Sequence, residues 1–324
     1  MTQHNILKTA ENVLRIEADS VSALINRLDD NFEKMVHCLI GIKGKVILTG
    51  MGKSGIIARK ISSTLASTGT PSFFMHPAEA SHGDLGVISK NDAVIVLSNS
   101  GNTKEIASIL PAIKLIGAKI IGFSGNKHSR LFELSDYFFD VSVAQEACPY
   151  NIAPTASTTA QLAIGDALAV ALLKERNFLE EDFAKLHPGG SIGKKFIKVA
   201  ELMHNGEEIP LVRDTVLLKD AILEMNSKRL GLTGVIDENN ILCGIIVDGD
   251  LRRAMLSPID IINEPVKNIM TKNPKTILKN ALAVNALQKM EESKITSLFV
   301  VESEGYKNPI GVIHIHDIIK AGII

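Results

Sequence analysis

The chain has 324 residues, of which 45% are hydrophobic and 22% are charged, values typical of a soluble globular protein with more than one domain. Lysine plus arginine (35) nearly balances aspartate plus glutamate (36), so the charge does not indicate nucleic acid or an anionic membrane surface as a partner. Cys38, Cys148 and Cys243 match no metal-ligand spacing, which favours free thiols in a reducing compartment such as the cytoplasm. The first residues lack an apolar signal core, and no apolar run reaches the roughly 18 residues of a membrane span.

The first half of the chain begins with two helical patterns and reaches its first strand at residues 45–49. Apolar residues recur at helical spacing over residues 6–28 and 32–42, which predicts two helices whose apolar faces could also make oligomer contacts. After the strand comes G-M-G-K-S-G and then a helix predicted over residues 56–67. Its predicted buried side carries Ile56, Ile57, Ile61 and Leu65.

The glycine turn G-M-G-K-S-G resembles two nucleotide-binding motifs and satisfies neither. Gly50, Gly52 and Gly55 fit the dinucleotide fingerprint, but no acidic residue follows about 20 positions later to hold a ribose hydroxyl. Ile47 stands where a P-loop has its first glycine. Lys53 lies in the first turn of the helix, where a cation opposes the helix dipole. Either an anionic ligand offsets this cost, or Lys53 is a solvated lysine at a helix end.

Two histidines follow the strand predicted at residues 72–75. His76 and His82 lie beyond its carboxyl end, where ligands bind in open α/β sheets. Their spacing matches no helical metal-ligand pattern, so acid-base use is favoured over a required metal, and an inhibitory zinc ion would find its ligands here. A loop histidine without a catalytic role is the alternative for each.

Residues 94–106, V-I-V-L-S-N-S-G-N-T-K-E-I, predict a phosphate site. Residues 94–97 form an unbroken apolar run, as a parallel strand buried on both faces requires. The small residues that follow let the backbone approach a ligand, and the predicted donors to an anion are Ser98, Ser100 and Thr103. The alternative is an ordinary turn in which Asn102 caps the next helix and Glu105 closes a capping box.

A helix at residues 104–116 and strands at 119–124 and 137–143 complete a mostly parallel sheet of the α/β class. A further apolar helix begins at T-A-S-T-T, where the hydroxyls of Thr155 and Thr158 either cap the helix or contact a polar substrate. In L-H-P-G-G-S-I-G, residues 186–193, a proline and two glycines predict a loop that presents His187. A turn residue without a partner is the alternative for His187.

The second half of the chain is an internal repeat. Met203 matches Met270 and Asp250 matches Asp317, each pair 67 positions apart (270 − 203 and 317 − 250). Each repeat predicts a helix, two strands joined by a turn, and an acidic residue that opens a helix. This pattern resembles a tandem pair of CBS modules. The resemblance implies an α+β unit that binds an adenosyl nucleotide, with Asp250 and Asp317 holding ribose hydroxyls, or one that is purely structural or mediates oligomer contacts.

With G-M-G-K-S-G, S-H-G-D-L-G, S-N-S-G-N-T and L-H-P-G-G in this order ahead of a CBS pair, the chain resembles the D-arabinose-5-phosphate isomerases. The resemblance implies a sugar isomerase (SIS) domain with a five-stranded parallel, flavodoxin-like sheet over residues 1–200, and CBS modules over residues 201–264 and 265–324. It also implies a cytoplasmic homotetramer without a cofactor. Such an enzyme interconverts D-ribulose 5-phosphate and D-arabinose 5-phosphate, and the latter feeds 3-deoxy-D-manno-octulosonate synthesis for lipopolysaccharide or capsule.

By the same resemblance, Lys53, His82, Glu105 and His187 fall on catalytic positions, while Asn102 replaces a glutamate that some relatives carry. The predicted contacts to phosphate and substrate are Gly52, Ser54, Ser98, Ser100, Gly101, Thr103, Thr155 and Thr158. A transcriptional regulator with an SIS fold is one alternative, but residues 1–42 lack the basic helix-turn-helix that it would need. A nucleotide sensor without isomerase activity is the other.

Overall fold

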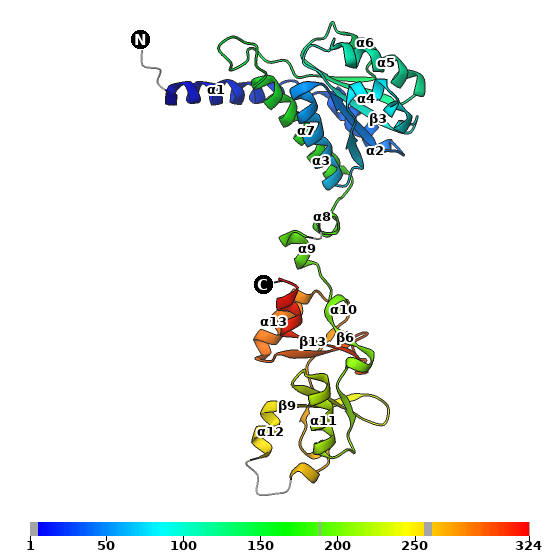
Figure 1. Cartoon of the computed structure of the whole chain (residues 1–324), viewed down its shortest axis with the longest axis vertical. Helices are drawn as coiled ribbons and strands as arrows, with labels where there is room; N and C mark the ends of the chain where they lie inside the picture. The colour runs from blue at the N-terminus through cyan, green and yellow to red at the C-terminus, as the bar shows by residue number, and fades with distance from the viewer. Residues whose placement is uncertain (1–5, 188, 256–260, 324) are drawn as a thin grey trace. The chain divides into compact units, whose positions relative to one another are not determined.

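The structure, a computed structural model, describes residues 6–187, 189–255 and 261–323 and divides into two compact units, Met1–Phe183 and Ala184–Ile324 (Figure 1). A parallel sheet of five strands forms the centre of the first unit, in the order β2-β1-β3-β4-β5. Its strands are β1 (Val46–Gly50), β2 (Ser72–Phe74), β3 (Ala93–Leu97), β4 (Lys119–Ser124) and β5 (Tyr137–Asp140). This is the flavodoxin-like order, so the predicted fold class is confirmed.

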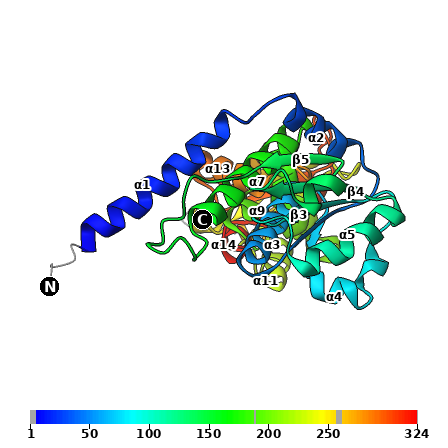
Figure 2. The same cartoon turned by 90° about the horizontal axis from the view of Figure 1, so that it is seen from above.

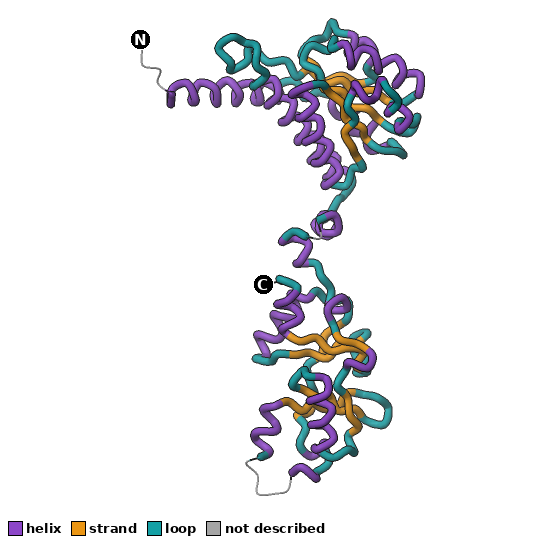
Figure 3. Tube along the Cα trace, in the orientation of Figure 1, coloured by secondary structure: helices purple, strands orange, loops and turns teal. Residues whose placement is uncertain are grey.

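Helices cover both faces of this sheet (Figure 3). One face packs against α1 (Ile6–Ile25), α2 (Asp30–Gly41), α3 (Gly52–Ser67) and α7 (Ala156–Glu175), and the other against α4 (Pro77–Ser81), α5 (Lys104–Ile116) and α6 (Arg130–Leu134). The side chains of a strand alternate between the two faces: Leu48 belongs to the first hydrophobic cluster, and Ile47 to the second. Both faces of β1 and β3 are therefore buried, as their continuous apolar runs predict.

The first helix leaves much of its apolar surface exposed. Only Ser20 and Leu24 are buried in α1, whereas Ile6 and Leu7 are 79% and 80% exposed. Figure 2 shows the N-terminal end of α1 extending away from the sheet. An apolar helix face without a partner is typical of a contact with another chain.

Two local predictions about the first half were wrong. Helix α3 begins at Gly52 rather than at residue 56, and its buried stripe runs through Gly55, Ala58 and Ile61, so Ile56 points off that stripe and is 69% exposed. The predicted loop at residues 186–193 is shorter than expected. Leu186 still belongs to α8 (Glu180–Leu186), and α9 (Ser191–Lys195) begins directly after Gly190.

Helix α7 is apolar along most of its length, as the sequence predicted. By length and mean hydropathy (1.4) it could cross a membrane, and it is the one helix of the described residues that meets this criterion. It packs against α1, α2 and α3, and its buried residues, among them Ile164 and Leu168, lie in the core of the first unit. A buried core helix of a globular domain passes the same test, because periodicity and length do not separate the two cases.

The second unit contains two sheets of four strands, with orders β10-β9-β8-β7 and β11-β12-β13-β6. The strands are β6 (His204–Asn205), β7 (Leu211–Arg213), β8 (Leu232–Ile236), β9 (Leu242–Val247), β10 (Thr271–Lys272), β11 (Thr276–Leu278), β12 (Ser297–Val301) and β13 (Pro309–His314). The helices are α10 (Val199–Leu202), α11 (Leu218–Lys228), α12 (Asp248–Ala254), α13 (Ala283–Ser293) and α14 (Ile315–Lys320), with short 3₁₀ turns at Gly206–Glu208, Ile261–Asn263 and Val266–Asn268.

The two predicted repeats exchange their first strands. β6 opens the first repeat yet pairs with β13 of the second, and β10 opens the second repeat yet pairs with β9 of the first. Phe299 from the second repeat also packs with Leu232 and Leu242 of the first. The repeats therefore form one interlocked body.

Candidate active site

The loops after β1 and β3 meet at the carboxyl edge of the sheet. Gly50 is in register with Leu97, and strand order reverses between these two strands, which is where open α/β sheets bind ligands. A Cβ on Gly50 would lie 3.0 Å from the Leu97 carbonyl oxygen and 3.1 Å from the Gly55 nitrogen. Only glycine allows this close approach of the two turns and the helix.

The turn after β3 is held together by its own hydroxyl groups. The buried Ser98 Oγ accepts a hydrogen bond from the Gly101 N–H (3.1 Å) and lies 3.1 Å from Thr103 Oγ1. Ser100 Oγ is exposed and accepts from the Asn102 N–H (3.3 Å). Gly101 has φ +67°, and a Cβ there would collide with Ser129 Oγ. The predicted phosphate residues thus form one compact turn at the start of α5.

The alternative interpretation of this turn, a capping box, is wrong. The residue that caps α5 is Thr103, which makes no side-chain capping bond, and Asn102 Oδ1 instead accepts from the Arg130 N–H (2.8 Å). The half-buried Glu105 carboxylate has no hydrogen bond or ion pair within the described ranges. Glu105 is therefore an unengaged carboxylate in the first turn of a helix beside the phosphate turn, as a catalytic base would be.

The other predicted catalytic residues lie at helix ends. Lys53 is exposed in the first turn of α3, whose N-cap residue Met51 provides no side-chain acceptor. His82 is exposed at the carboxyl end of α4. His187 follows α8 in the second unit, so the first unit itself contributes Lys53, His82 and Glu105.

One cavity lies against the glycine turn, a second lies beside the first, and Glu105 lines neither. One of about 460 Å³ is lined by Gly50, Gly52, Ile56 and His76, and one of about 310 Å³ by Glu79, Asp84 and Val87. They share Arg59, whose guanidinium lies 5.0 Å from the centre of the Phe74 ring. Sequence reasoning missed Arg59, because an exposed arginine in a helix gives no local signal.

His76 and His82, the predicted ligands of an inhibitory zinc ion, are not joined by a third ligand within the described residues. His76 Nδ1 accepts from the Ala78 N–H (3.3 Å) and so caps α4. In the part of the chain that the structure describes, no group of three or more histidine, cysteine or acidic side chains could hold a metal ion.

Thr155 is the N-cap residue of α7 but makes no side-chain capping bond, and a carboxylate that sequence reasoning missed binds the start of the helix instead. Glu146 accepts from the Thr155 N–H (2.8 Å), the Thr155 hydroxyl (3.0 Å) and the Ser157 N–H (3.2 Å) at the start of α7. Thr158 Oγ1 donates to the Thr155 carbonyl (2.9 Å). Burial raises the pKa of Glu146, but hydrogen bonds from Ser157 and Thr155 outweigh it and lower the pKa below the ordinary value.

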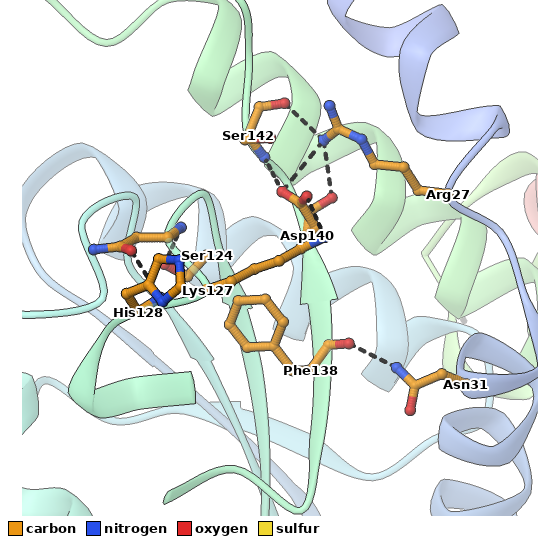
Figure 4. A network of polar contacts seen from close by, with 9 residues as sticks. Arg27, Asn31, Ser124, Lys127, His128, Phe138, Asp140 and Ser142 are labelled. Carbon is orange, nitrogen blue, oxygen red and sulfur yellow. Dashed lines mark hydrogen bonds and ion pairs between the residues drawn. The ribbon is translucent and has the colours of Figure 1, made fainter. Parts of the chain in front are cut away.

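A larger cavity of about 670 Å³ lies along β5, at the far edge of the sheet from the glycine turn, and its groups serve the fold. Asn31 donates to the Phe138 carbonyl (2.6 Å), and Arg27 donates to the carbonyls of Asp140 (3.0 Å) and Ser142 (2.7 Å) (Figure 4). The bonds to Phe138 and Asp140 occupy backbone acceptors on an edge strand, and such acceptors are a common site of pairing with another chain. Size alone therefore does not identify the active site.

Comparisons with known proteins decide the family. The sequence matches the SIS domain over residues 39–171 and the CBS domain over residues 199–257 and 266–323. Arabinose 5-phosphate isomerase KdsD of Pseudomonas aeruginosa is 47% identical over 321 residues, which are 99% of this chain and 98% of that protein. The chain belongs to the arabinose 5-phosphate isomerase family. The protein of the same name from Escherichia coli K12 is 44% identical over 322 residues, 98% of this chain and 96% of that one.

Solved structures support the same membership of the arabinose 5-phosphate isomerase family. The Escherichia coli CFT073 protein c3406, solved in complex with arabinose 5-phosphate, is 41% identical, with a TM-score of 0.56, covering 58% of this chain and 100% of that chain. A solved structure named as a sugar-phosphate isomerase from Listeria monocytogenes is 35% identical, with a TM-score of 0.56, and covers 58% of this chain and 100% of that chain.

Proposed function

We propose that the protein is an isomerase that interconverts D-ribulose 5-phosphate and D-arabinose 5-phosphate through an enediolate. The observation that carries the proposal is the 47% identity to an arabinose 5-phosphate isomerase over 99% of the chain. The serine-lined turn at the reversal point of the sheet supports a phosphorylated substrate, because hydroxyl groups and free helix N–H groups bind phosphate.

The reaction moves a carbonyl between C1 and C2 of the sugar. Glu105 takes the proton from one of these carbons and returns it to the other, so it acts first as a base and then as an acid. Lys53 supplies positive charge to the enediolate oxygens or to the phosphate, and His82 and His187 transfer the protons of the oxygens. The scheme needs acid-base groups and no cofactor.

The substrate's phosphate occupies the turn of Ser98, Ser100, Gly101 and Thr103, with Gly52 and Ser54 at the neighbouring helix end. In this proposal Thr155 and Thr158, at the start of α7, line the opposite side of the substrate site. Support comes from the proximity of the two turns, which Gly50 and Leu97 bring into register. In this scheme, the phosphate anchors the sugar so that C1 and C2 reach the Glu105 carboxylate.

In the cell, the product would supply 3-deoxy-D-manno-octulosonate synthesis for lipopolysaccharide or capsule in the cytoplasm. We assign residues 1–200 to the SIS domain and residues 201–264 and 265–324 to the CBS modules, which would bind one nucleotide near Asp250 and Asp317. The exposed apolar face of α1 supports assembly into a homotetramer. Light scattering should then give four times the 35.0 kDa mass of one chain.

A substrate panel tests the proposal. The purified full chain is incubated separately with ribulose 5-phosphate, glucosamine 6-phosphate and a hexulose 6-phosphate, and the products are separated by chromatography. Conversion of ribulose 5-phosphate to arabinose 5-phosphate is expected, with no turnover of the hexose derivatives. Turnover of a hexose phosphate alone would reassign the substrate, and the absence of all turnover would favour a sensor.

A further inference from the structure

The repeats differ at one titratable position. His204 and Thr271 are equivalent, since each directly follows the matched methionine of its repeat and they are 67 positions apart (271 − 204). Each lies on the exchanged strand, β6 or β10, and contacts the matched aspartate of the other repeat. We call each contact between an exchanged strand and the aspartate of the other repeat a crossing. The first crossing (Thr271 with Asp250) carries a hydroxyl, and the second (His204 with Asp317) carries an imidazole.

At the first crossing, the groups that contact the aspartate keep the same charge near neutral pH. Asp250 is 6% exposed, and its Oδ2 accepts from the Val247 N–H (3.0 Å). Its Oδ1 accepts from the Thr271 hydroxyl (3.2 Å) and pairs with Arg253. Neither a hydroxyl nor a guanidinium changes its charge near neutral pH.

At the second crossing the imidazole lies between two carboxylates. His204 Nε2 is 3.2 Å from Asp317 Oδ2, and His204 Nδ1 is 3.2 Å from Glu208 Oε2. Asp317 Oδ2 also accepts from the His314 N–H (3.1 Å). Carboxylates accept hydrogen bonds and cannot donate them, so both contacts are satisfied only when both ring nitrogens carry a proton.

The neighbouring histidines do not compete for this role. The titratable groups that contact His204 are Glu208 from the 3₁₀ turn and Asp317 from α14, and His314 interacts with His204 electrostatically. His314 Nδ1 accepts from the His316 N–H (3.1 Å), so its ring is neutral when it caps α14. Burial, followed by the charge of His316, lowers the pKa of His314, while Asp317 acts in the opposite direction.

We propose that His204 is a proton-dependent clasp that joins the first strand of one repeat to the last helix of the other, and that only this crossing responds to pH. When His204 loses a proton, one of its two carboxylate contacts is lost. Imidazole is the side chain whose charge ordinarily changes near neutral pH. The clasp acts on Asp317, the carboxylate proposed for the second nucleotide contact, so it offers a route from pH to the CBS pair.

Hydrogen exchange of the full chain, followed by mass spectrometry at pH 6 and pH 8 and corrected for the intrinsic exchange rate, tests the clasp. Peptides that contain His204 or residues 312–320 should exchange several-fold faster at pH 8 than at pH 6 in the natural protein. In His204→Thr, which installs the residue of the equivalent crossing, this difference should vanish. In Thr271→Val, the matched control, it should persist.

Glu208→Gln provides a second variant, because Glu208 is largely exposed and its replacement leaves the fold intact. A neutral imidazole can donate to Asp317 alone and accept from the new amide, so the pH difference should shrink strongly in this variant. The clasp is refuted if His204→Thr keeps the pH response of the natural protein, or if the natural protein shows none. Isomerase turnover is measured on the same samples, so its loss would be seen separately from that of the clasp.

Discussion

Replacing Glu105 by glutamine should remove most isomerase activity and leave the fold intact. The carboxylate has no hydrogen bond or ion pair within the described residues, so the amide loses no protein contact. What is lost is the attraction of a negative charge to the N-terminus of α5, about 0.3–1 kcal/mol of unfolding free energy. In the reaction, the amide cannot take a proton from carbon, which lowers kcat by about 10²–10⁴. That corresponds to roughly 2.7–5.4 kcal/mol in the activation free energy.

The assay is the initial rate of arabinose 5-phosphate formation over a range of ribulose 5-phosphate concentrations, with thermal unfolding measured on the same preparation. KM should change by less than about threefold, because the phosphate turn is untouched. Glu133→Gln is the matched control, since Glu133 is an exposed glutamate whose partner is Arg130 at 2.9 Å. Near-normal turnover of Glu105→Gln would refute the assignment of the base. If thermal unfolding showed that Glu105→Gln is largely unfolded, the prediction that the fold stays intact would be refuted instead.

Three further predictions concern the phosphate turn, acid stability and the sheet edge. Gly101→Ala should raise KM for the sugar phosphate at least tenfold, because φ +67° disfavours alanine and a Cβ would displace Ser129; steady-state kinetics with inorganic phosphate as competitor checks this. Burial raises the pKa of Asp92, but hydrogen bonds from the backbone and the charge of Lys45 outweigh it, so the net pKa is lowered. The ionised form therefore stabilises the fold above about pH 3.9, and this stability is lost as the pH falls. Asp92→Asn should therefore lower the free energy of unfolding by about 1–3 kcal/mol at pH 7 and by much less near pH 3, measured by urea denaturation; an equal loss at both would contradict it. Arg27→Ala should lower the free energy of unfolding by about 1–3 kcal/mol in the same assay and increase light scattering on heating, because the carbonyls of Asp140 in β5 and of Ser142 lose their donor; unchanged stability would contradict it.

The sequence predicted those elements whose pattern is local. β4 and α5 have the predicted bounds, because a buried apolar run and a helical repeat each ended at clear small or polar residues. The start of α3 was missed, because Gly52 and Gly55 resemble a loop even where the helix has already begun. Ile56 was placed on the wrong side, because a helical repeat alone does not say which stripe meets the sheet.

The parts of the structure that could not be predicted depend on contacts between distant residues. Arg27 reaches carbonyls more than a hundred positions away in sequence, and His204 reaches Asp317 across 113 positions. Glu146 is separated from α7, the helix whose start it binds, by an irregular loop, so no periodic pattern in the sequence indicates this contact. The four proposed catalytic residues came from motif resemblance, and the structure added the reason why Glu105 is unengaged: Asn102 turns to Arg130 and leaves the capping box unmade.

Deuterium transfer tests the enediolate most directly. The full chain is incubated with ribulose 5-phosphate in deuterated water, and the arabinose 5-phosphate formed is examined by proton NMR at the carbon next to the aldehyde. Carbon-bound deuterium at that position is predicted for the natural protein, with Glu105→Gln failing to introduce it at a comparable rate. No aldose at all, or aldose in which solvent deuterium never appears even after prolonged equilibration of the two sugars, would contradict proton transfer by a carboxylate that exchanges with water at this site.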